Sequence, residues 1–171
     1  YDYTHGWFFV TTCSHQRRPL FGQVVDGRMQ LSPLGSLVVA EWEKTAVVRT
    51  AVGLDAYVVM PNHFHGIIAL DNDNTHTVGA SRRLAPTTIS PQPGSLGAIM
   101  AQFKSIVTKR HNRAQETTGI RVWQRGYYER IIRNERELNA IREYIANNPA
   151  RWAEDRENLD GLVSKMELRS S

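Results

Sequence analysis

Apolar residues follow two spacings along the first third of the chain, and the change from one to the other predicts the order of its elements. Aromatic and β-branched residues over 7–14 are typical of a strand, and an Asp-Gly pair between short apolar pieces at 23–31 indicates a small hairpin. From 33 to about 50 the apolar residues recur at helical spacing after a Ser-Pro start, and we expect this helix to stop near Gly53.

The remainder of the chain shows the same alternation of spacings. Two short apolar runs at 55–60 and 63–70 predict a pair of antiparallel strands. A helix with an apolar stripe follows the cap residue Ser95, and another strand is expected at 128–132. Residues 134–137 resemble a capping box with Asn as the cap, which predicts a last helix directly after that strand.

Strand, helix, strand, strand, helix, strand is the order of the split βαβ unit. It predicts an α+β, ferredoxin-like fold, with a four-stranded antiparallel sheet, two helices on one face and a further C-terminal helix. The length suits one domain over 1–171, with an exposed insertion loop at 71–94, a short helix within 152–158 and a tail at 153–171. This fold hosts many activities, so function must be argued from particular residues.

Composition narrows the class of protein only moderately. Hydrophobic residues make up 41% and charged residues 22%, as in globular proteins, and the net charge of +4 suits a polyanionic partner. The single cysteine, Cys13, excludes an internal disulfide and favours a reducing compartment. No apolar run approaches a membrane span and the start lacks a signal-peptide pattern, so we expect no membrane partner and a cytoplasmic location. Because the chain begins with Tyr1 rather than Met, a trimmed N-terminus is expected.

The stretch His63-Phe64-His65 is the sharpest candidate for chemistry. Residues two apart on a strand point to the same face, so the two imidazoles lie side by side and Phe64 turns to the opposite face. Imidazole is the commonest nitrogen ligand of a divalent ion. The spacing alone favours two polar surface residues over a metal site. Gly66 favours a site somewhat, because a residue without a side chain leaves room for a nucleotide to approach.

Tyr144 and Asn148 lie four residues apart on the last predicted helix and therefore share one of its faces. A tyrosine at the edge of an apolar stripe is most often a half-buried packing residue with its hydroxyl in water. A tyrosine hydroxyl can also act as a covalent nucleophile, and an amide oxygen one turn later is a hard ligand for a cation. The spacing does not choose between these two interpretations.

Basic residues gather at loops and element ends, with aromatic residues among the later ones. Arginine beside aromatic side chains suits single-stranded or distorted nucleic acid, through phosphate contact and base stacking. For any single pair of these residues, an ordinary solvated surface is the simpler explanation. The residues expected to contact DNA are Arg17, Arg18, Arg82, Arg83, Lys104, Arg121, Arg125, Arg130 and Arg133.

Two stretches of the chain resemble the single-tyrosine HUH transposases of bacterial insertion sequences, and most closely their domesticated branch, the transposases associated with repetitive extragenic palindromes. These stretches are MPNHFHGII and WQRGYYERIIRNERELNAIREYIANNPARW. The resemblance implies that His63, His65 and Asn148 bind a divalent ion, Mg²⁺ or Mn²⁺, and that Tyr144 is the nucleophile. Tyr127 and Tyr128 rank below Tyr144, because they lack its helical position and its polar partner one turn later.

The activity that the resemblance implies is transesterification of single-stranded DNA at hairpin-forming repeats, through a 5′-phosphotyrosine. It also implies a nucleoid-associated protein that acts as a monomer or a homodimer. One alternative is a non-catalytic hairpin-binding protein that keeps the fold. Another is a ferredoxin-like RNA-binding module, although nothing here resembles the RNP1 pattern of such modules.

Overall fold

A computed structural model describes residues 5–71 and 93–154 of the 171-residue chain. Its elements follow one another along the chain as β1 (His5–Cys13), η1 (His15–Arg17), β2 (Gly22–Val25), β3 (Arg28–Leu31), α1 (Pro33–Val47), β4 (Val52–Val59), β5 (His63–Asp71), α2 (Leu96–Ala114), β6 (Tyr128–Ile132), α3 (Glu135–Asn147) and η2 (Trp152–Glu154). None of the helices in these described ranges has the length and apolar character needed to cross a membrane.

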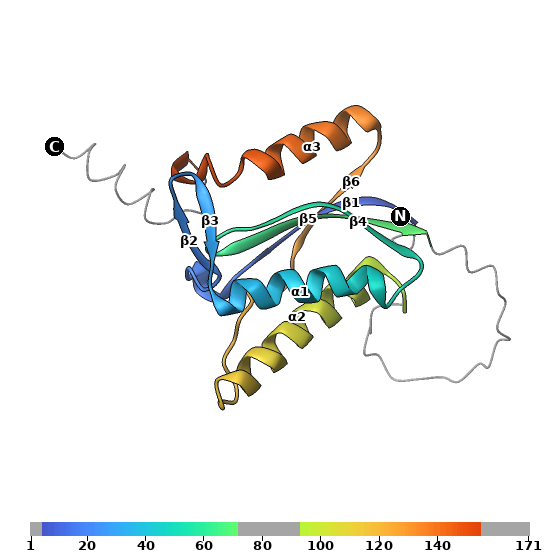
Figure 1. The fold of residues 1–171 in the computed structure, drawn as a ribbon. Coiled ribbons are helices and arrows are strands. Elements are labelled where there is room, and N and C mark those ends of the chain that lie inside the picture. The colour runs from blue at the N-terminus through green and yellow to red at the C-terminus, as the bar shows by residue number, and fades with distance from the viewer. Residues whose placement is uncertain (1–4, 72–92, 155–171) are drawn as a thin grey trace, which may run out of the picture.

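The main sheet has four strands in the order β4-β5-β1-β6, and all neighbouring strands are antiparallel. Helices α1 and α2 cover one face, and α3 lies across the other (Figure 1). This is the arrangement of a split βαβ unit, so the predicted α+β, ferredoxin-like fold is confirmed. The predicted hairpin forms a separate two-stranded sheet, β2-β3, whose turn residues Asp26 and Gly27 both have positive φ.

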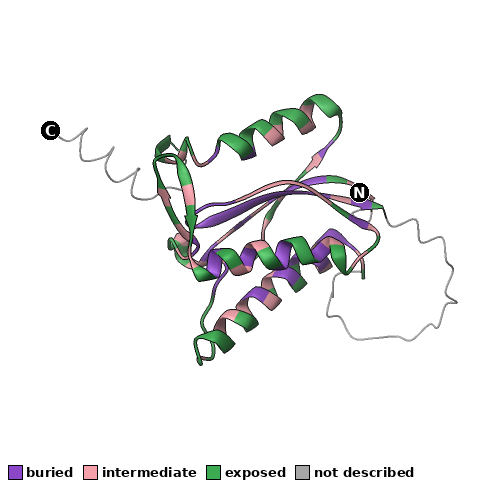
Figure 2. Ribbon diagram, viewed as in Figure 1, coloured by how far each residue is buried: buried purple, intermediate pink, exposed green. Residues whose placement is uncertain are grey.

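Alternation along the strands divides the apolar residues between two layers of unequal size. Phe8 and Phe64 belong to the large cluster beneath α1 and α2, around the buried Trp42. The cluster beneath α3 is smaller and has Phe9 and Ile145 among its buried members. Helix α3 is therefore largely exposed (Figure 2), and polar side chains of the sheet can meet it without crossing a thick core.

The observed boundaries correct the expected end of the first helix and the expected start of the 71–94 loop, and they cover only part of the expected C-terminal helix. Helix α1 ends at Val47 and not near Thr50, and Gly53 lies inside β4, because Val52 and Gly53 pair with Leu70 and Ala69 of β5. The short C-terminal helix is the 3-10 turn η2, whereas 155–158 and most of the 153–171 tail lie outside the described residues. Of the 71–94 loop, residue 71 still belongs to β5 and 72–92 lie outside the description.

Gly66 faces the core and does not leave room for a ligand, which corrects the expectation drawn from the sequence. It lies on the same face of β5 as Phe64, opposite to His65. A Cβ atom built on Gly66 would lie 2.7 Å from Cζ2 of Trp42 and 2.9 Å from the ring of Phe64. Both aromatic side chains are fully buried, so neither can move away cheaply.

We therefore expect Gly66→Ala to lower the free energy of unfolding by about 1–3 kcal/mol, the usual effect of overpacking a core. Denaturant unfolding followed by circular dichroism measures it. Gly53→Ala is the matched control in the neighbouring strand, because its Cβ would meet Ala69 at an ordinary 3.5 Å. Equal stability of the two variants would contradict this account of Gly66.

Candidate active site

The two imidazoles lie side by side on β5, a central strand of the sheet. Their ring centroids are 4.5 Å apart, and His63 and His65 are 0% and 4% exposed. They are therefore buried, which excludes the interpretation of two polar surface residues. The ring of His65 stacks on Phe9 of β1, and its Nδ1 lies 2.7 Å from the hydroxyl of Thr11.

Tyr144 of α3 contacts His65 from the helix that covers this face of the sheet. Its hydroxyl lies 3.3 Å from Nε2 of His65, and the two ring centroids are 5.3 Å apart. Its ring also packs edge-on against Phe9, and the residue is 47% exposed. Tyr144 is thus both a packing residue and a residue whose hydroxyl is directed at a buried histidine.

Asn148 lies between two contacts that the C-terminal segment makes with the histidines. Four residues before it Tyr144 contacts His65, and four residues after it Trp152 lies over His63, with ring centroids 6.0 Å apart. Asn148 is 4% exposed, and its Oδ1 is buried without a hydrogen bond to any described residue. A buried amide oxygen that lacks a donor is costly unless a ligand satisfies it.

These residues fit a divalent ion. No three His, Cys, Asp or Glu side chains cluster as a metal site within the described ranges, so a further donor beside His63 and His65 would come from another group, such as an amide oxygen. The unsatisfied Oδ1 of Asn148 is such an oxygen. Two imidazoles and one amide leave further positions open to water or phosphate oxygen.

Burial holds the His65 imidazole toward the neutral form that binds metal. The pKa of His65 lies well below its usual range, chiefly because the ring is desolvated and secondly because a charge on His63 would oppose its own. A neutral imidazole keeps one nitrogen lone pair for a ligand.

Asn62 joins His63 to the turn that follows β1, and the sequence analysis missed it. Its Nδ2 donates to the carbonyl of Arg17 at 3.2 Å, and its Oδ1 lies 2.9 Å from Nδ1 of His63. Because the amide nitrogen is the donor to Arg17, the amide oxygen accepts from Nδ1–H of His63. The lone pair of His63 is then on Nε2.

We expect Asn62→Leu to weaken Mn²⁺ binding by about 10- to 100-fold, the usual effect of losing the group that orients a histidine ligand. Titration calorimetry of the folded variant with MnCl₂ measures this affinity. Asn139→Leu is the control, since that amide is exposed on α3 and contacts Arg142. If Asn62→Leu bound the ion as tightly as the unmodified protein, the orienting role of Asn62 would be excluded.

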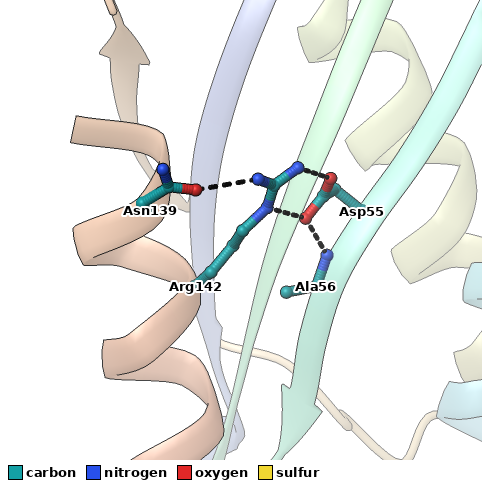
Figure 3. Close-up of polar contacts among 4 residues, drawn as sticks. All are labelled: Asp55, Ala56, Asn139 and Arg142. Carbon is teal, nitrogen blue, oxygen red and sulfur yellow. Dashed lines mark hydrogen bonds and ion pairs between the residues drawn. The ribbon is translucent and has the colours of Figure 1, made fainter. Parts of the chain in front are cut away.

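An ion pair fastens α3 to the edge strand β4. Arg142 donates to both carboxylate oxygens of Asp55, at 2.8 and 2.6 Å, and to Oδ1 of Asn139 at 2.9 Å (Figure 3). Asp55 lies where the pairing of β4 shifts its register between Leu54 and Tyr57. Such a bulge turns a side chain out of the regular alternation. Arg142 precedes Tyr144 by two residues, so this ion pair fixes the helix close to the candidate nucleophile.

The Asp55–Arg142 ion pair predicts an acid-sensitive contribution to stability. Hydrogen bonding from Arg142 is the largest cause that lowers the pKa of Asp55 below 3.8. The unfolded chain therefore binds this proton at a higher pH than the folded chain. The contribution is complete above about pH 5 and is lost as the pH falls through the folded-state pKa.

Accordingly, the stability difference between the unmodified protein and Asp55→Asn should be constant between pH 7 and 5, and should shrink toward pH 3. Urea unfolding at each pH measures the difference. Asp26→Asn, at the tip of the β2-β3 hairpin, is the control with an exposed carboxylate. A difference that stays the same down to pH 3 would count against the ion pair.

The residues expected to contact DNA lie in different environments. Arg17 and Arg125 line a cleft beside His65 and Tyr144. Arg18 and Arg121 are exposed. Nζ of Lys104 donates to the carbonyls of Gln124 and Gly126 and so supports the loop before β6.

Of the remaining members of that set, Arg130 lies in β6 and Arg133 directly follows β6. Arg130 pairs with Glu137 at 2.6 Å, and the backbone N–H of Arg133 donates to the same carboxylate at 3.0 Å. Arg82 and Arg83 fall within the range that the structure does not describe.

Other residues of the site also went unrecognised in the sequence. Thr11 and Asp55 lie in strands without any motif, and only pairing across the sheet or with α3 gives them a role. Trp152 is in the stretch that carries the resemblance, but its position over His63 depends on the turn after α3. Asn62 directly precedes His63 in the sequence. Its amide, which can hydrogen-bond a neighbouring imidazole, was the feature that could have identified it as a site residue.

Comparison with known proteins identifies a relative in sequence. No model of a protein family matches the chain. An uncharacterized protein of Haemophilus influenzae Rd is 37% identical over 164 residues, covering 94% of this chain and 89% of that protein.

Two solved structures share the fold. A REP-associated tyrosine transposase bound to a REP hairpin aligns with a TM-score of 0.55 and 18% identity, over 88% of this chain and 70% of that one. A candidate transposase from Deinococcus radiodurans R1 aligns with a TM-score of 0.50 and 14% identity, over 86% of this chain and 92% of that one. The fold is therefore transposase-like.

Proposed function

This chain belongs to the same family as the Haemophilus influenzae protein and has a transposase-like fold, and from this premise we propose that it is a transposase of the single-tyrosine HUH type, closest to those associated with repetitive extragenic palindromes. It nicks and rejoins single-stranded DNA through a 5′-phosphotyrosine. One observation carries the proposal: within one chain, the Tyr144 hydroxyl lies 3.3 Å from Nε2 of the buried His65, beside His63.

The reaction is an exchange of phosphodiester bonds at Tyr144. The phenol oxygen forms a bond to phosphorus as the bond from phosphorus to the 3′-oxygen breaks. The phenol loses its proton and the leaving 3′-oxygen gains one. Because one phosphoester bond forms for each that breaks, the bond energy is kept and rejoining needs no ATP. A phenol suits this role because its pKa of about 10 is lower than that of an aliphatic hydroxyl.

His63, His65 and Asn148 would bind Mg²⁺ or Mn²⁺ in this proposal. The ion supplies charge compensation for the phosphate oxygens when it is bound. The chain itself provides the neutral imidazole of His65, the packing of Phe9 that orients the Tyr144 ring, and the ion pair that fixes α3. The 3.3 Å contact between Tyr144 and His65 of one chain supports a monomeric active site, with a homodimer as the alternative.

The proposed substrate is single-stranded DNA beside a hairpin. The similar REP-associated transposase was solved with a REP hairpin, and the net charge of +4 suits a polyanion. A cytoplasmic, nucleoid-associated location follows from this substrate. The alternative is a hairpin-binding protein without cleavage activity. The adduct experiment described next has to distinguish it from the proposed transposase.

The deciding experiment incubates the protein with hairpin oligonucleotides in MgCl₂ or MnCl₂ and examines the products on a denaturing protein gel. We expect label at the 3′ end of the strand to remain with the protein, because the tyrosine is joined to the 5′-phosphate of that fragment. Label at the 5′ end should be released on a shorter strand. Hairpin binding without any adduct would favour the non-catalytic alternative.

A further inference from the structure

We propose that a cleft beside Tyr144 binds a nucleotide of the single strand a few positions from the scissile phosphate, with Tyr128 as the surface on which its base stacks. This inference rests on the proposed function and adds a substrate subsite to it. The cleft has a volume of about 640 Å³, within the range of ligand sites. His65 and Tyr144 line one side of it, and Tyr127 and Tyr128 line the other.

The register of the sheet determines the distance between Tyr128 and His65. Thr11 of β1 pairs with His65 of β5 on one side and with Tyr128 of β6 on the other. These three residues form a row across the sheet, and their side chains point to the same face. With strands about 4.8 Å apart, His65 and Tyr128 are separated by roughly 10 Å, a distance that about three stacked nucleotides span.

Tyr128 has the properties of a stacking surface. It is 58% exposed, although it lies in a strand of the main sheet, and α3 leaves its ring uncovered. A large exposed aromatic group at the mouth of a cleft costs hydrophobic free energy unless a ligand covers it. Because every base has a π-face, stacking on such a ring tolerates any sequence.

The charges lining the cleft identify the ligand as a polyanion. Arg17 and Arg125 line the cleft, and no Asp or Glu of the described chain does so. Arg125 also lines a second cavity of about 1110 Å³, together with Lys109 and Arg121 and again without a described carboxylate. The two cavities share Gln124 and Arg125 in their linings, so the basic lining continues from the cleft beside Tyr144 into the second cavity.

The cavity on the other side of Tyr144 is less basic. It has a volume of about 420 Å³ and is lined by Glu143, Glu154 and Arg151. Arg151 pairs with Glu154, so Glu143 leaves the lining with a net negative charge that disfavours phosphates. A bound strand would therefore run from Tyr144 across Tyr128 and past Arg125. A single-stranded nucleic acid needs an aromatic stacking surface and a row of cations along the same path, and the proposed function makes that strand DNA.

The backbone conformation near Arg17 supports the proposal that Arg17 contacts phosphate in the cleft beside Tyr144. Gln16 and Arg17 have φ values of +55° and +54°, which non-glycine residues rarely adopt. Asn62 holds this turn through the carbonyl of Arg17. The turn places Arg17 at the cleft. Asn62 therefore positions both Arg17, proposed to contact phosphate, and His63 of the candidate metal site.

Binding of fluorescein-labelled dT12, measured by anisotropy without any cleavage step, tests the cleft. Tyr128→Ala should weaken binding by about 5- to 150-fold, the equivalent of 1–3 kcal/mol per stacked base, whereas Tyr128→Phe should bind almost like the unmodified protein. Trp7→Ala is the matched control, an exposed aromatic residue on the same face of β1 outside the cleft. Equal affinity of Tyr128→Ala and the unmodified protein would overturn the proposal.

The salt dependence tests the phosphate contact separately. Arg125→Ala should lower the slope of log K against log salt by about 0.7, the value for one phosphate of a single strand. Arg49→Ala, in the layer of α1 and α2, should leave the slope unchanged. An unchanged slope for Arg125→Ala would remove that residue from the subsite.

The two proposals can fail independently. If dT12 binding depends on Tyr128 but no hairpin yields a covalent adduct, the cleft stands and the transposase function does not. If adducts form while Tyr128→Ala binds normally, the function stands and the subsite is wrong.

Discussion

Tyr144→Phe should abolish the covalent protein–DNA adduct and reduce cleavage by at least about 10⁴-fold, on the scale seen when other enzymes lose their nucleophile. The substitution removes one oxygen and keeps the ring that packs on Phe9 and His65. DNA affinity and thermal stability should therefore change little. The measurement is the yield of denaturation-resistant adduct with 3′-labelled hairpin DNA in Mn²⁺.

Tyr127→Phe is the control for this experiment. Tyr127 lies in the same cleft and was a competing nucleophile in the sequence, but it precedes β6 and is not on α3. We expect its adduct yield to match that of the unmodified protein. Adduct persisting in Tyr144→Phe, or lost in Tyr127→Phe, would move the nucleophile away from α3.

Replacing His65 with alanine is expected to have the second-largest effect, a loss of cleavage of about 10²- to 10⁴-fold in Mg²⁺ or Mn²⁺. The substitution removes one of the two imidazoles proposed to bind the ion. Adding EDTA to the unmodified protein should have a comparable effect. Single-turnover cleavage at saturating DNA measures the rate.

Direct measurement of Mn²⁺ binding separates a lost ligand from a damaged fold. Titration calorimetry should show one tightly bound equivalent in the unmodified protein and none in His65→Ala, with the circular dichroism spectrum of a folded protein in both. His111→Ala, in the last turn of α2, is the control histidine and should bind as the unmodified protein does. Equal cleavage rates with and without His65 would refute the metal site.

Much of the fold could be predicted because its determinants are local. Ser32, Ser95 and Asn134 each accept a hydrogen bond from a backbone N–H three residues later, and each begins a helix where the sequence placed it. Strand β6 has the bounds that were predicted for it. The end of α1 could not be predicted as well, because it depends on pairing with β5, a strand far along the chain.

For the candidate site, the sequence by itself determined that His63 and His65 share one face of a strand and that Tyr144 and Asn148 share one face of a helix, because the periods of strands and helices are fixed by backbone geometry. Only the tertiary structure decided that these two faces meet, that Gly66 turns into the core, and that Tyr128 stands in the same row as His65. Those outcomes depend on strand register and on contacts such as Asp55 with Arg142, which join residues 87 positions apart. No local pattern records such pairs, since their energy exists only once the chain has folded.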